Sequence, residues 1–127
     1  MRVFSCLVHD HQWSIVLLAA LMCCAGSSIA ITLFRRTMAE RGVSRLHWCF
    51  LSAVTAGAAT WATHFIAMLG YDPGVATGYD FLLTAGSLAI VTAAAGAAFW
   101  LALRLGGWGG PAVGAIVLGC GIATMHY

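Results

Sequence analysis

The sequence predicts an all-α, polytopic membrane protein, a bundle of four transmembrane helices built as two repeated helical hairpins. Apolar residues make up 61% of the 127 residues and charged residues only 8%. That is too little charge to cover a water-soluble domain of this size. Four long apolar stretches are separated by short segments that contain arginine, aspartate, proline or glycine. A short pattern, in which a histidine follows a glycine by seven residues and an aromatic residue comes next, occurs twice.

Each apolar stretch has the length of a membrane span. The first, residues 13–34, forms a helix of about 22 residues or roughly 33 Å, enough for a hydrocarbon core of about 30 Å. The next stretches are 46–70, 81–103 and 111–127. Helices are predicted because lipid leaves unpaired backbone groups unsatisfied, and these stretches are too long for barrel strands. Pro111 suits the first turn of the last helix. That helix has about 17 residues, at the lower limit for spanning, so we expect it to be truncated.

The connecting segments indicate the orientation of the chain. Segment 35–45 holds four of the six basic residues and is predicted to be a loop; Arg104 follows the third span. The positive-inside rule places these arginines on the cytoplasmic side of the membrane. The N-terminus and the turn at 71–80 then face outward, which is the periplasm if this is a bacterial inner-membrane protein. His64 and His126 also lie toward that side, near the ends of the second and fourth spans.

The repeated pattern indicates a functional site. Its two copies are Gly57, His64 and Phe65, then Gly119, His126 and Tyr127. The second and fourth helices run in the same direction, so the two histidines are predicted to lie at similar depth. A histidine inside an apolar span is costly and by default indicates function.

The residues around these histidines favour copper. His64 and Met68 are four residues apart and share one helix face, and Met125 precedes His126. Imidazole and thioether donors together suit a soft or borderline metal, copper above all and especially Cu(I). One alternative is haem b with His64 and His126 as axial ligands. Another is an inactive, truncated membrane fragment in which both histidines only hydrogen-bond neighbouring helices.

Other function classes lack their usual signals. No nucleophile elbow, phosphate-binding loop or pair of carboxylates within a span is present, so we expect no enzyme activity. No basic patch interleaved with aromatic residues indicates nucleic-acid binding. The cysteines within the apolar runs are predicted to pack as small hydrophobic residues. Asp10 and Asp80 each precede a predicted helix and are expected to cap it.

Several of these segments resemble the MHYT domain, an integral membrane sensory domain of bacteria. The segments are WATHFIAM in the second span, GIATMHY in the fourth, His9-Asp10 before the first and Gly78-Tyr79-Asp80 before the third. The resemblance covers nearly the whole chain and implies one domain, 1–127. It also implies copper binding through Met and His residues, and through the copper the sensing of oxygen, carbon monoxide or nitric oxide.

The resemblance identifies the site residues by position. Met125, His126 and Tyr127 match the motif, whereas His64, Phe65 and Met68 match an earlier, degenerate copy. The family often precedes cyclic-di-GMP synthase and phosphodiesterase domains, and it usually has a third hairpin. This sequence contains neither, so a complete metal site is expected only in a homo-oligomer.

Overall fold

A computed structural model describes residues 12–70 and 78–126. For residue 126 it describes the backbone only. Within these ranges the chain forms four helices, which confirms the predicted all-α fold. They are α2 (Trp13–Ala39), α3 (Gly42–Leu69), α4 (Phe81–Arg104) and α5 (Gly109–His126). In the described part of the chain, α2, α3 and α4 are long and apolar enough to cross a membrane, and α5 is a shorter apolar helix. The chain is therefore a multi-pass membrane protein.

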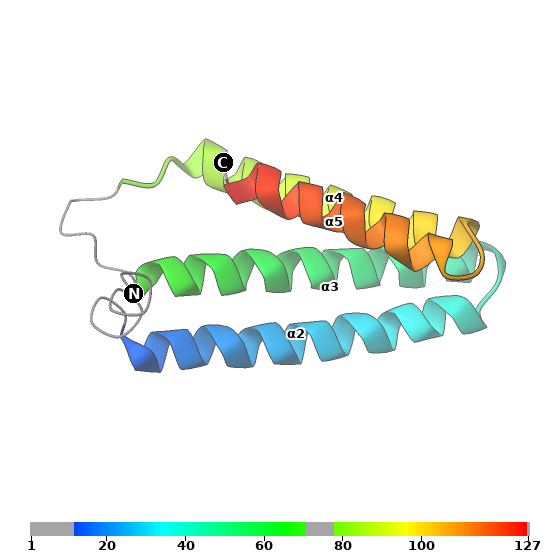
Figure 1. Ribbon diagram of the computed structural model, residues 1–127, viewed down its shortest axis with the longest axis horizontal. Helices are drawn as coiled ribbons and strands as arrows, with labels where there is room; N and C mark the ends of the chain where they lie inside the picture. Colours follow the sequence, from blue (N-terminus) through cyan, green and yellow to red (C-terminus); the bar gives the residue numbers. More distant parts are fainter. Residues whose placement is uncertain (1–11, 71–77, 127) are drawn as a thin grey trace.

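The helices pack as two antiparallel hairpins placed side by side (Figure 1). Helix α3 packs against α2 on one side and α4 on the other, and α5 packs mainly on α4. The bundle has two ends. We call the one where α3 and α5 finish the histidine end, and the one where α2 and α4 finish the arginine end. At the histidine end, the Gln12 N–H donates to the carbonyl oxygen of Gly70 at 3.2 Å and ties α2 to α3.

The prediction of a loop at residues 35–45 is wrong. Helix α2 continues to Ala39 and α3 begins at Gly42, so only two residues connect them. Arginine is a good helix former, and its long side chain carries the charge to the interface from a helical backbone. The turn uses Gly42, whose φ of 64° lies in the left-handed region that favours glycine. Hydropathy thus located the edge of the apolar span rather than the end of the helix.

Small residues bring the helices together. Glycines face neighbouring helices at Gly26 (toward Ala59), Gly57 (toward Thr92) and Gly114 (toward the Ala98 carbonyl). An added Cβ on Gly57 would lie 2.7 Å from Thr92 Cα, and one on Gly114 would lie 2.7 Å from Ala98 O. Such close approach is typical of membrane helices, where packing replaces the hydrophobic effect. The fully buried Val91 and Ala95 of α4 lie at the centre of this packing.

Candidate functional site

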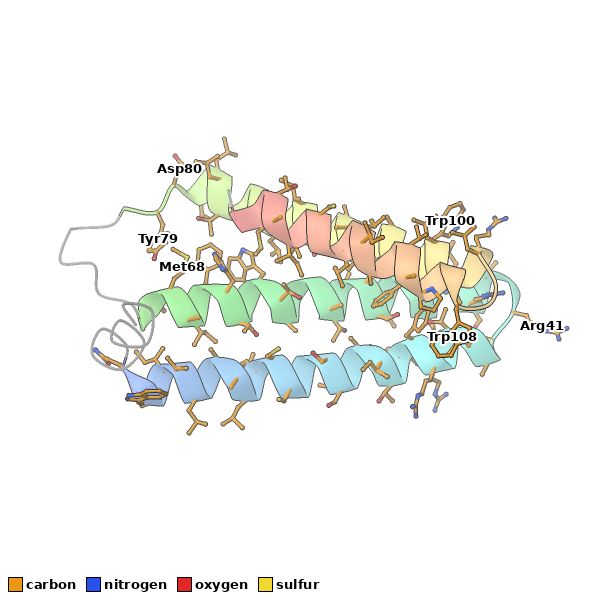
Figure 2. All side chains as sticks on the ribbon, viewed as in Figure 1. Arg41, Met68, Tyr79, Asp80, Trp100 and Trp108 are labelled. Carbon is orange, nitrogen blue, oxygen red and sulfur yellow. The ribbon has the colours of Figure 1, made fainter. Side chains whose placement is uncertain are left out.

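A cavity of about 250 Å³ opens at the histidine end of the bundle. It is lined by the last turns of α3, the start of α4 with the residues just before it, and the last turn of α5. Figure 2 shows Met68 and Tyr79 at this end, with Asp80 at the start of α4. Three of the four predicted ligands, His64, Met68 and Met125, line this one cavity. The side chains of His126 and Tyr127 lie outside the described residues.

An aromatic cluster lies on one side of His64. The imidazole meets the Phe65 ring edge-on, with ring centroids 5.4 Å apart and planes at 90°. Phe65 in turn packs on Trp61 at 4.6 Å and on Tyr79 at 5.9 Å. Ring pairs in such tilted or edge-on arrangements add about 0.5–1.5 kcal/mol beyond the area that they bury. The cluster therefore fixes one wall of the cavity and links α3 to the segment before α4.

A polar contact joins α3 to α4 beside the cavity. The indole N–H of Trp61 donates to Ser87 Oγ at 3.1 Å and to the Thr84 carbonyl oxygen at 3.3 Å. Ser87 Oγ itself donates to the same carbonyl at 2.7 Å. An indole N–H that is half-buried in an apolar bundle needs an acceptor, which Thr84 and Ser87 supply. Sequence reasoning missed Tyr79, Thr84 and Ser87 as cavity residues, although two hydroxyls three residues apart in an apolar span were a visible signal.

The start of α4 is fixed by the predicted cap. Asp80 Oδ1 accepts hydrogen bonds from the backbone N–H groups of Leu82 at 2.8 Å and Leu83 at 3.0 Å. This confirms the capping role expected for Asp80, which also lines the cavity. The cap expected at Asp10 falls outside the described residues. A fixed helix start holds Tyr79, the preceding residue, against the Phe65 ring.

One polar atom next to His64 is not satisfied. Within the described part of the chain, the buried hydroxyl of Thr63 has no hydrogen-bond partner. By contrast, Thr60 Oγ1 donates to the Ala56 carbonyl oxygen at 2.9 Å, the usual arrangement for a threonine inside a helix. An unpaired buried hydroxyl costs about 1–3 kcal/mol. Thr63 is thus a destabilising residue in the turn of α3 that carries the histidine.

The cavity residues fit a soft metal ion. Among the described residues no group of three or more His, Cys, Asp or Glu side chains comes together. The donors on the cavity are instead the imidazole of His64 and the thioethers of Met68 and Met125. Thioether donors select Cu(I) over harder divalent ions.

Comparison with known proteins identifies the family. The MHYT family model, described as "Bacterial signalling protein N terminal repeat", matches residues 57–115. The chain contains an MHYT domain. The matched segment holds the first copy of the repeated pattern and all of α4, so it includes most of the cavity wall.

Several bacterial signalling proteins are similar to this MHYT domain over most of its length. An uncharacterized signaling protein of Caulobacter vibrioides is 36% identical over 126 residues, 99% of this chain. In Pseudomonas aeruginosa, the bifunctional diguanylate cyclase/cyclic di-GMP phosphodiesterase MucR is 30% identical over 95% of the chain. The cyclic di-GMP phosphodiesterase NbdA of the same organism is 35% identical over 90%.

The MHYT domain matches only a small part of each of these relatives. It spans 16% of the Caulobacter protein, 18% of MucR and 15% of NbdA. The chain therefore corresponds to the MHYT membrane sensor domain of bacterial signalling proteins, and the enzyme domains of these relatives lie outside the matched part. No solved structure gives a significant match to the chain.

Proposed function

We propose that this MHYT domain is a copper-binding sensor that takes up a diatomic gas through the metal. The ligands proposed are His64, Met68, Met125 and His126. The observation that carries the proposal is that three of these donors, from two helices of different hairpins, line one cavity. When bound, Cu(I) would supply a metal centre that can bind oxygen, carbon monoxide or nitric oxide.

The position of the donors suggests how ligation would act on the protein. Met68 belongs to α3 and Met125 to α5, whereas the main packing of these helices within the described residues is on α2 and α4. Ligation by both methionines would therefore join the two hairpins at the histidine end. A change in that ligation on gas binding would favour one helix arrangement over another, which is what transmission of a signal requires.

The proposed site faces the periplasm. The arginines of α2, α3 and α4 lie at the opposite end of the bundle from the cavity. The positive-inside rule assigns that arginine end to the cytoplasm of the bacterial inner membrane. Because two relatives are named as cyclic-di-GMP enzymes, we propose that the sensor controls such an enzyme domain.

Copper binding is tested on protein purified in detergent and loaded anaerobically with Cu(I). Metal analysis is expected to give stoichiometric copper, and X-ray absorption is expected to show sulfur and nitrogen ligands. The triple variant His64→Ala, Met68→Leu and Met125→Leu should lose the copper. The matched control Met22→Leu with Met38→Leu removes two exposed α2 methionines that do not line the cavity and should keep it. Equal copper in both variants would refute the proposed ligands.

The same preparation separates the remaining alternatives. A copper-to-chain ratio of one half would mean that two chains share one site, as expected for a homo-oligomer. A Soret absorbance peak after haem-replete expression would mean that the domain binds haem b rather than copper. Carbon monoxide added to the Cu(I) form should give a carbonyl infrared band that is missing from the triple variant. If protein with stoichiometric copper gives no such band, the gas-binding part of the proposal fails.

A further inference from the structure

A cavity larger than the one at the histidine end shares no lining residue with it. It has a volume of about 730 Å³ and runs between α3 and α4, with no residue of α2 or α5 in its lining. Small side chains such as Ala53, Ala89 and Gly96 line it together with bulky ones such as Phe50 and Trp100. We call it the α3–α4 groove. Its wall on α4 runs from residue 85 to residue 100, or roughly 22 Å of helix. That exceeds the about 15 Å of one leaflet of the hydrocarbon core.

The groove continues into a basic mouth at the arginine end. A second cavity of about 270 Å³ shares Leu46, Cys49 and Trp100 with the groove and adds Arg45 and Arg104. Figure 2 shows Trp100 at this end of the bundle. The Arg104 guanidinium lies over the Trp100 ring, 5.0 Å from its centroid. This contact holds one of the two charges beside the opening of the groove.

A helix terminus adds to the positive potential of the mouth. Gly42, the first residue of α3, lines it. The residue before it makes no side-chain cap, and the first turn of α3 contains no acid. The N–H groups of that turn are therefore open to an anion at the positive end of the helix dipole. Among the described residues no carboxylate lines the mouth or the groove.

We propose that the mouth and the groove together bind one anionic glycerophospholipid. Its phosphate lies between Arg45, Arg104 and the start of α3, and one acyl chain lies along the α3–α4 groove. Basic pockets between transmembrane helices are suited to anionic head groups. Free phosphate would leave the apolar groove unfilled. A zwitterionic lipid would bring a cation to a mouth without a carboxylate. The site is separate from the cavity at the histidine end and does not depend on copper.

Native mass spectrometry of the detergent-purified chain with added phosphatidylglycerol or phosphatidylcholine tests the head-group contact. We expect phosphatidylglycerol to be retained preferentially. Arg45→Gln with Arg104→Gln should lower its retention by roughly 10- to 30-fold, as expected for the loss of two arginine contacts. The control Arg35→Gln with Arg41→Gln removes the same charge outside the mouth, and Figure 2 shows Arg41 projecting from the turn between α2 and α3. Equal retention in the two double variants, or no lipid preference, would overturn the proposal.

A second pair of variants tests the acyl chain. Ala93 and Ala97 are both exposed on α4, but only Ala93 lines the groove. Ala93→Phe should therefore reduce phosphatidylglycerol retention and Ala97→Phe should not, while both keep the helical circular dichroism of the parent. Excess inorganic phosphate should fail to displace the lipid. Full retention by folded Ala93→Phe, displacement by phosphate alone, or a lipid-free dimer blocked by Ala93→Phe would each overturn the assignment.

Discussion

Replacing Gly57 with alanine should push α3 and α4 apart. Gly57 is buried where these helices cross, and an added Cβ would lie 2.5 Å from Thr92 Oγ1 and 2.7 Å from Thr92 Cα. Carbon atoms in ordinary contact are about 3.5–4.0 Å apart. A hydroxyl can rotate away, but a backbone Cα cannot. The two helices must therefore separate by about 1 Å at this crossing to restore that contact distance.

The expected cost of Gly57→Ala is about 1–3 kcal/mol of unfolding free energy, the range for overpacked cores. The separation should also reach the cavity at the histidine end, because Trp61 lies one turn further along α3. The hydrogen bond from Trp61 to Ser87 Oγ is 3.1 Å long. If the helices separate by about 1 Å, the donor–acceptor distance exceeds roughly 3.5 Å, the upper limit for a hydrogen bond. Loss of that bond is expected to change the fluorescence of Trp61.

The control for this substitution is the equivalent glycine of the second copy. Among the described residues, an added Cβ on Gly119 would meet nothing within 4 Å. Gly119→Ala should therefore leave stability unchanged or raise it by up to about 1 kcal/mol through helix propensity. Both variants are compared by SDS titration in detergent, with helical circular dichroism and tryptophan fluorescence as readouts. If Gly57→Ala unfolds at the same SDS fraction as Gly119→Ala, the close crossing of α3 and α4 is refuted.

Three further predictions use the same protein. Thr63→Val should raise the unfolding free energy by about 1 kcal/mol, because it removes a buried hydroxyl without a partner; a loss of stability in the SDS titration would contradict this. Asp80→Ala should cost about 1 kcal/mol through loss of the α4 cap, and Asp80→Asn should restore most of it; equal titration curves for the two would argue against capping. In a cysteine-free background, a membrane-impermeant thiol reagent added to intact spheroplasts should label Gly78→Cys but not Arg41→Cys. The reverse pattern would invert the proposed orientation.

The sequence determined the features that depend on local chemistry or on composition. Apolar stretches of spanning length predicted the helical bundle, because lipid forces backbone groups to pair within each segment. Asp80 and Pro111 marked the starts of α4 and α5, since a cap and a first-turn proline act within a few residues. The end of α2 was misplaced because the helix continues past the edge of its apolar span.

The sequence also predicted which residues of α3 and α5 belong to the candidate site, but not that they lie together. His64 and Met68 share a helix face by their spacing, and Met125 was identified by the repeated pattern. That Met125 lines the same cavity as His64 depends on how α4 positions α5, which no spacing along the chain specifies. The same holds for Tyr79 and Ser87, which belong to the wall of this cavity because they meet Phe65 and Trp61 across helices.

The two glycines of the repeated pattern show the difference between what the sequence determines and what the tertiary structure determines. Gly57 and Gly119 hold the same place in the pattern, yet Gly57 packs closely against Thr92, whereas a Cβ on Gly119 would have open space in the part of the chain that the structure describes. Two residues further along α5, it is Gly121 that lies in close contact with a neighbouring helix, facing Ala94. Sequence alone determined which residues the helices carry and which of them share a face. Only the tertiary structure decided which faces meet, because each contact depends on the position of a neighbouring helix that is distant in the chain.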